Sequence, residues 1–149
     1  MDFPVLAPWP CEAPPTALIE GLEKHPAGVV QIEDNYFAVY DREEDVRSIR
    51  PDFRLLEALH PAGVAITAPG DNSDFVSRYF APSYGIPEDP VTGSTHCSLA
   101  PYWAQRLGKA SLHARQVSER SGQVWCEVRG ERVILKGQAV LTLWGELLI

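Results

Sequence analysis

The sequence predicts an α+β fold in which strands form a roll or barrel around one buried central helix. Residues 95–107 are apolar on most sides, which is typical of a helix buried around its circumference. Short β-branched runs separated by glycines follow this segment, as in an antiparallel meander. The chain has 149 residues, of which 45% are hydrophobic and 22% charged, so we expect one globular domain over residues 1–149.

The N-terminal elements follow from local patterns. Residues 1–7 alternate weakly and predict a short strand, and the proline-rich stretch from Pro8 to Pro15 then interrupts regular structure. Residues 16–25 place their large aliphatic side chains on one stripe, which predicts an amphipathic helix. Residues 28–32 and 36–40 flank a Glu-Asp-Asn turn and therefore predict a hairpin.

The middle of the chain predicts two more helices and two strands. Residues 43–49 form a short helical pattern, and Pro51 suits the first position of the next helix. Residues 64–68 and 75–80 are predicted strands, because a Pro-Gly-Asp-Asn turn separates two β-prone runs.

The C-terminal third begins with the buried helix of residues 95–107. Pro101 lies inside it and predicts a distorted first turn or a kink, while Gly108 is a natural terminator. Beyond this helix, we expect four strands at residues 112–117, 124–128, 132–135 and 139–143.

Charge and hydropathy narrow the possible classes of function. The net charge is −7, the pI is about 5.0 and the basic residues are scattered, which argues against a nucleic-acid-binding surface. No apolar run approaches the ~20 residues of a membrane span, and no signal-peptide pattern opens the chain. We therefore expect a cytoplasmic protein with neither nucleic acid nor a membrane as partner.

The three cysteines, Cys11, Cys97 and Cys126, form no CxxC pair and no zinc-like spacing, so we expect neither a metal site nor a disulfide framework. Cys97 lies near a predicted helix start, where a lowered thiol pKa would make it a nucleophile. A buried packing role is favoured, because free cysteine is among the most buried residue types.

The most informative segment is residues 85–97, Gly-Ile-Pro-Glu-Asp-Pro-Val-Thr-Gly-Ser-Thr-His-Cys. Its two prolines present Glu88 and Asp89 on a stiff, extended stretch. The free N–H groups of the following helix start favour a carboxylate or phosphate ligand. A carboxylate base beside an anion site is what proton abstraction next to a substrate carboxylate requires. The alternative is an ordinary turn followed by a helix cap.

Together with Asp-Phe-Val-Ser-Arg-Tyr-Phe-Ala-Pro at 74–82 and Ser-Leu-Ala-Pro-Tyr-Trp at 98–103, this segment resembles the phenazine-biosynthesis isomerase (PhzF-like) family. That family has the diaminopimelate epimerase fold. The resemblance covers nearly the whole chain but only the C-terminal half of a family member, so it implies one lobe of that fold. It also implies an isomerase or epimerase that acts on a small carboxylate-bearing molecule without metal or organic cofactor.

On this resemblance, Asp89 matches the family's active-site aspartate and Ser94 its substrate-contacting serine. Nothing in the sequence matches the family's catalytic glutamate or its Gly-His-Pro or Gly-His-Ala turn. The candidate substrate-binding residues at the helix start are Gly93, Ser94 and Thr95. Arg78 and His96 are two further candidates, although Arg78 could instead be paired at the surface and His96 could simply pack.

A lone lobe would leave its first and last strands without partners, and unpaired strand edges favour association. We therefore expect a two-fold homodimer with terminal strands exchanged or packed across the interface, including the apolar end formed by Trp144, Leu147, Leu148 and Ile149. Two alternatives remain open. One is a half-enzyme that needs a separate partner resembling the missing lobe. The other is a non-catalytic small-molecule-binding protein or degenerate remnant.

Overall fold

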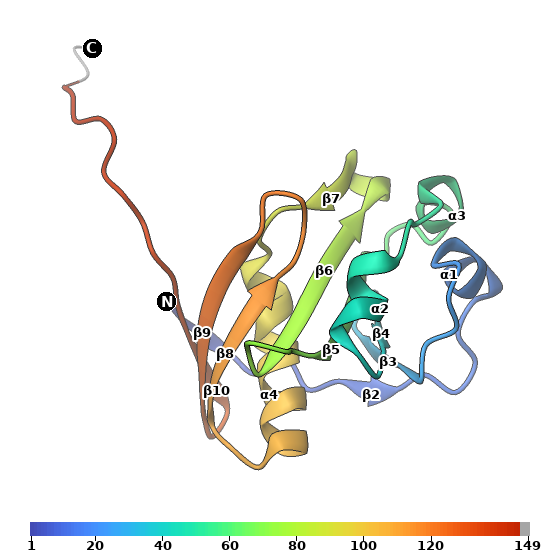
Figure 1. Ribbon diagram of the computed structural model, residues 1–149, viewed down its shortest axis with the longest axis horizontal. Helices are drawn as coiled ribbons and strands as arrows, with labels where there is room; N and C mark the ends of the chain where they lie inside the picture. Colours follow the sequence, from blue (N-terminus) through green and yellow to red (C-terminus); the bar gives the residue numbers. More distant parts are fainter. Residues whose placement is uncertain (147–149) are drawn as a thin grey trace.

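The computed structural model describes residues 1–146, which form a ten-stranded sheet with helices on both faces (Figure 1). The strand order is β1-β10-β9-β8-β6-β5-β4-β3-β2, and β7 pairs with β6 beside this path. The strands are β1 (Asp2–Pro4), β2 (Trp9–Pro10), β3 (Gly28–Ile32), β4 (Asn35–Val39), β5 (Val64–Pro69), β6 (Phe75–Ala81), β7 (Ile86–Asp89), β8 (Ser111–Gln116), β9 (Gly122–Arg129) and β10 (Arg132–Lys136). The helices are α1 (Thr16–Gly21), α2 (Glu43–Ser48), α3 (Phe53–Glu57) and α4 (Gly93–Leu107), with a 3₁₀ turn at Pro82–Tyr84.

The sheet is mixed, and its connections explain where the helices lie. The predicted hairpin forms β3 and β4, and β8, β9 and β10 form the predicted antiparallel meander. Two neighbouring pairs, β4–β5 and β6–β8, are parallel. Parallel neighbours need a crossover connection; α2 and α3 lie in the first and α4 in the second. The predicted α+β class is confirmed.

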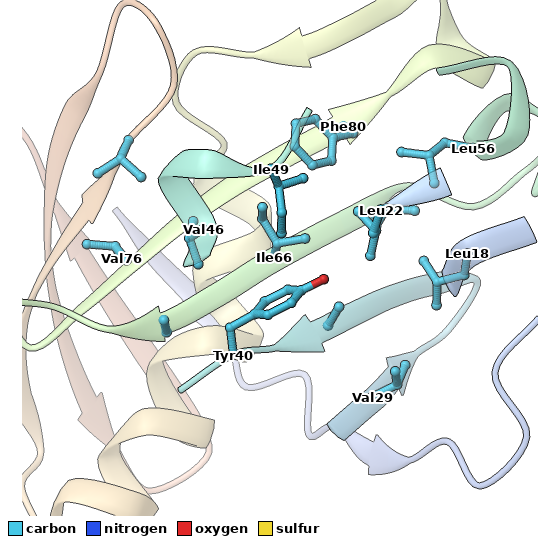
Figure 2. Packing of buried hydrophobic residues seen from close by; sticks show 14 residues of the cluster. Leu18, Leu22, Val29, Tyr40, Val46, Ile49, Leu56, Ile66, Val76 and Phe80 are labelled. Carbon is cyan, nitrogen blue, oxygen red and sulfur yellow. The ribbon is translucent and has the colours of Figure 1, made fainter. Parts of the chain in front are cut away.

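One hydrophobic core lies between the sheet and the three short helices (Figure 2). Leu18 from α1, Val46 from α2 and Leu56 from α3 are fully buried over the central strands. Ile66 of β5 and Phe80 of β6 contribute from the sheet side. These helices have only five or six residues each, so tertiary packing rather than helix propensity stabilises them.

The second core lies on the opposite face, where α4 packs against β8, β9 and β10. Trp103 stacks on Phe75 at 5.8 Å between ring centroids, and its indole N–H donates to the Thr67 hydroxyl at 2.9 Å. The helix is continuous through Pro101, which lacks the N–H that would bond to the Cys97 carbonyl. The N–H of Leu6 donates to that carbonyl instead, at 3.1 Å. The N-terminal segment is thereby tied to the second core.

The structure corrects several details of the prediction. The sheet is not closed, because β1 and β2 are its two ends within residues 1–146, so an open sheet replaces the barrel form of the prediction. The segment 139–143 is not a strand. Residues 137–146 run away from the body of the molecule (Figure 1), and four of their side chains are 80–84% exposed: Val140, Leu141, Leu143 and Trp144. Leu147, Leu148 and Ile149 lie outside the described residues.

Smaller differences concern element ends. The first helix stops at Gly21, well short of the predicted end at residue 25. Pro51 precedes the third helix, which is capped by the Asp52 carboxylate accepting from the Arg54 N–H. Gly108 ends α4 in a left-handed conformation, as predicted, at φ 65°. No helix within residues 1–146 is long and apolar enough to cross a membrane.

Candidate active site

The informative segment forms a short strand followed directly by the long helix. Strand β7 pairs antiparallel with β6, and Asp89, its last residue, lies opposite Tyr79. Pro87 is compatible with this strand because β7 lies outside the main strand path and pairs only with β6. Helix α4 begins at Gly93, three residues after the turn at Pro90. The candidate base and the start of the buried helix are therefore joined by a three-residue connection.

The Asp89 carboxylate is oriented by its own loop. The Thr92 hydroxyl donates to Asp89 Oδ2 at 2.6 Å. Thr92 occupies the N-cap position of α4 and is only 8% exposed. A hydrogen bond of this kind, to a charged acceptor, is among the stronger ones in proteins. It fixes the carboxylate relative to the helix axis.

The start of α4 offers free hydrogen-bond donors. The first N–H groups of a helix, here from Gly93 to Thr95, have no carbonyl within the helix to bond. Ser94 is exposed, whereas Thr95 is buried. The positive end of the helix macrodipole adds to the attraction for an anion.

A hollow of about 230 Å³ opens beside this helix start. Tyr79 of β6 and Asn35 of β4 form its polar wall, since the Tyr79 hydroxyl donates to Asn35 Oδ1 at 3.0 Å. Burial raises the pKa of Tyr79, and nearby Tyr84 and Asp89 raise it further, so this phenol stays neutral. From α4, the hollow is lined by Ser94, Thr95 and Ser98. The rest of its lining is apolar or acidic: Leu6, Ile32, Phe37 and Glu33. Its size and mixed lining suit a small molecule with polar and apolar parts.

Arg78 points to the other face of β6, toward α2. Its guanidinium pairs with the Glu88 carboxylate through two hydrogen bonds of 2.8 and 2.9 Å. Its remaining nitrogen donates to the carbonyls of Val46 and Ile49 at 3.1 and 2.8 Å. Successive side chains of a strand face opposite sides, and Arg78 accordingly does not meet Tyr79 in the hollow. The structure thus separates Arg78 from the other candidate residues.

His96 lies inside the protein, one turn into α4. It is 0% exposed, and its Nδ1 lies 2.8 Å from the Thr92 carbonyl oxygen. A carbonyl can only accept, so Nδ1 carries the proton. Burial lowers the pKa of His96, which keeps the ring neutral. His96 therefore braces the Thr92 N-cap from within the helix.

Cys97 follows into the second core and is 4% exposed. Burial raises the pKa of its thiol, which disfavours the thiolate that a nucleophile would need. The favoured packing interpretation agrees with this environment. Within residues 1–146, no group of three or more His, Cys, Asp or Glu side chains is placed to hold a metal ion.

Three residues of this site carried no local signal in the sequence. Gln116 comes from β8 and reaches both Asp89 and Thr92. Asn35 comes from the predicted hairpin, and Tyr79 from the predicted strand of residues 75–80. Their roles depend on contacts between positions 24 to 44 residues apart, so periodicity alone could not reveal them.

Comparison with known proteins places this chain in a family. Residues 3–145 match the family model described as phenazine biosynthesis-like protein, PhzC-PhzF. The chain belongs to the PhzC-PhzF family. Two proteins of Pseudomonas aeruginosa, both named as uncharacterized isomerases, are 50% and 49% identical to it. Each match covers 99% of this chain and 56% of the relative.

A crystal structure of a PhzF-family phenazine biosynthesis protein from Enterococcus faecalis has the same fold, with a TM-score of 0.90 at 42% identity. That match covers 100% of this chain and 57% of the other. The chain therefore spans a little over half the length of the relatives it matches. The resemblance to the PhzF-like family that residues 74–103 indicated is confirmed.

Proposed function

We propose that this chain is a PhzF-like lobe of an isomerase or epimerase that moves a proton on a small carboxylate-bearing molecule, without metal or organic cofactor. The observation that carries the proposal is the position of the Asp89 carboxylate, which lies four residues before Gly93, the first residue of α4, and is anchored by Thr92. The isomerase names of the Pseudomonas aeruginosa relatives support the reaction class.

The substrate carboxylate would bind at the start of α4. The N–H groups of Gly93, Ser94 and Thr95 and the Ser94 hydroxyl supply donors there, and the helix dipole favours the negative charge. The adjoining hollow, with Tyr79 and Asn35, would take the rest of the molecule. This arrangement supports binding of a compact acid rather than of a large ligand.

Asp89 would act as the base. Removing a proton from the carbon next to a carboxylate moves negative charge onto the carboxylate oxygens as the bond breaks. Donors fixed at the start of α4 stabilise that charge without having to reorganise. Asp89 itself could return the proton to a neighbouring carbon on the same face. Return to the opposite face of the same carbon, as in an epimerisation, needs an acid on the far side of the substrate. His96 is too deeply buried to play that part.

We propose that a second copy of the chain supplies the far side of the site. The segment 137–146 carries four large apolar side chains exposed to solvent, and such surface is a common mark of an interaction site. Pairing of this segment with a partner's sheet would bury it. Light scattering is expected to give a dimer that becomes a monomer when residues 138–149 are removed. A full-length monomer at micromolar concentration would contradict the homodimer.

The fraction of the relatives' length that this chain covers favours a second candidate function, that of a half-enzyme. Because the chain spans 56% of the Pseudomonas aeruginosa proteins, a separate polypeptide that resembles the remainder could complete the cleft and bring the missing glutamate. Mixing the chain with such a polypeptide would then create activity that neither has alone. The third candidate is a non-catalytic binding protein. It would bind a ligand without turnover, both alone and after mixing with such a polypeptide.

Incorporation of solvent deuterium tests the activity. The protein is incubated in D₂O with a panel of small carboxylic acids, and mass spectrometry follows exchange at carbon. Asp89→Asn is expected to lower the exchange rate by a factor of about 10² or more, the usual effect of a general base. Asp34→Asn, at an exposed hairpin turn, is the matched control and is expected to exchange normally. Equal rates for wild type and Asp89→Asn would remove Asp89 as the base.

A further inference from the structure

Gln116 joins the end of β7 to the start of α4. It is the last residue of β8 and is 1% exposed. Its Oε1 accepts from the Thr92 N–H at 2.8 Å, and its Nε2 donates to the Asp89 carbonyl at 2.7 Å. The same nitrogen donates to Thr92 Oγ1 at 3.1 Å. These partners fix which end of the amide is oxygen, because a backbone N–H only donates and a carbonyl only accepts.

These contacts give the hydrogen bonds a direction. The Thr92 hydroxyl has one proton. Because Gln116 Nε2 donates to the hydroxyl oxygen, the hydroxyl proton is free to point to Asp89 Oδ2 at 2.6 Å. The result is a chain of donation from Gln116 through Thr92 to Asp89. Successive donors in such a chain strengthen one another.

The chain of donation leaves the two oxygens of Asp89 unlike each other. Oδ2 is held by Thr92, while Oδ1 accepts no hydrogen bond from any residue between 1 and 146. From the other side, His96 holds the Thr92 carbonyl through Nδ1. The backbone N–H, the backbone carbonyl and the hydroxyl of Thr92 are thereby all engaged, so the hydroxyl has little freedom to turn away from Asp89.

We propose that Gln116 is a positioning residue for Asp89, acting through Thr92 to hold Oδ2 and so present Oδ1 to the substrate carbon. This inference rests on the proposed function, in which Asp89 is the base. The competing role for Gln116 is purely structural, as a clamp that closes the end of β8 onto the start of α4. The two roles differ in whether the glutamine senses the carboxylate.

A titration without turnover tests the chain of donation. The side-chain amide resonances of Gln116 are followed by NMR as the Asp89 carboxyl is titrated with acid. They are expected to move with the carboxyl in wild type and in Thr92→Ser, which keeps the hydroxyl. They are expected to follow it only weakly in Thr92→Val, which keeps the shape but removes the hydroxyl and leaves only the contact of Nε2 with the Asp89 carbonyl. In Asp89→Asn they are expected not to respond. A wild-type amide that ignores the titration, or one that responds equally in Thr92→Val, would overturn the proposal.

Kinetics supply the second test. Gln116→Met and Thr92→Val are expected to lower the turnover number for deuterium exchange about 10- to 100-fold, because a misplaced catalytic group loses rate on that order, while Thr92→Ser keeps most of it. The affinity for a carboxylate ligand is expected to change less than twofold, because the donors of the α4 start remain. If Gln116→Met kept the wild-type turnover number per folded molecule and only lowered the Tm, the role of Gln116 would be structural and the proposal would be refuted.

The two tests separate this inference from the proposed function. If wild-type protein exchanges no candidate substrate but its Gln116 amide follows Asp89 through Thr92, the isomerase activity fails and the positioning arrangement stands. If wild type exchanges and Asp89→Asn does not, while Gln116→Met exchanges normally, the activity stands and the positioning role is refuted.

Discussion

The ion pair between the buried Arg78 and the partly buried Glu88 gives the sharpest stability prediction. Arg78 is 8% exposed and makes four hydrogen bonds, two to the Glu88 carboxylate and one each to the carbonyls of Val46 and Ile49. Arg78→Met keeps much of the side-chain volume but leaves a carboxylate without its counterion and two carbonyls without this donor. Breaking a fully buried pair by removing one partner costs about 3–5 kcal/mol. Because the Glu88 side chain is 20% exposed, we expect a loss near the lower end of that range.

Urea unfolding followed by tryptophan fluorescence measures this loss. The matched control is Arg129→Met, which breaks a pair with Glu127 that has the same two-bond geometry but an arginine side chain 62% exposed. Exposed pairs are worth about 0–1 kcal/mol, so this variant is expected to unfold nearly as wild type does. The double variant Arg78→Met/Glu88→Met is expected to lose less than the two single losses added together, because neither charge is then left unpaired.

Two results would refute this reasoning. A loss below about 1 kcal/mol for Arg78→Met would mean that solvent reaches the pair and that the carbonyls find other donors. Strict additivity in the double variant would mean that Arg78 and Glu88 do not stabilise each other.

Two further predictions concern the hollow and the thiols. Gly63→Ala would place a methyl group 2.0 Å from the Tyr79 hydroxyl, so we expect thermal denaturation to show a loss of about 1–3 kcal/mol in unfolding free energy. Gly28→Ala, with nothing within 4 Å, is expected to cost far less. Equal losses would show that the Tyr79 side chain moves aside without cost. Burial raises the pKa of Cys126 to about 12, so its reactive thiolate is scarce at pH 8 and increases only as the pH rises toward that value. Iodoacetamide is therefore expected to modify the half-buried Cys11 well before Cys126. Mass spectrometry that showed the reverse order would contradict the burial of Cys126.

Local patterns sufficed wherever an element depends on neighbours in the sequence. The hairpin of β3 and β4 was predictable because a Glu-Asp-Asn turn separates two β-branched and aromatic runs. The long helix α4 was predictable because its apolar side chains recur on most sides and Gly108 follows it. Pro101 did not end this helix, since the N–H of Leu6, nearly a hundred residues away, satisfies the carbonyl that the proline leaves free.

Local patterns failed where the partner is distant. The segment 139–143 has strand-like composition, but within the described residues it has no neighbouring strand to pair with. The extended stretch around Glu88 became strand β7 because β6 lies beside it. Arg78 was a candidate ligand from sequence, and only the fold reveals that it faces α2 while Asp89 bonds to the start of α4. Residue type indicated the chemistry, and the fold decided which groups meet.

The central claim is that a small carboxylate binds at the start of α4 beside Asp89. The most direct measurement is a map of backbone amide chemical shifts during titration with such an acid. The largest changes are expected at Gly93, Ser94 and Thr95, and Ser94→Ala is expected to weaken binding by about 0.5–1.5 kcal/mol, the net value of one hydrogen bond. Changes that instead centre on the separate hollow lined by Arg115, Arg120 and Lys136, or an affinity that Ser94→Ala leaves unchanged, would contradict the account.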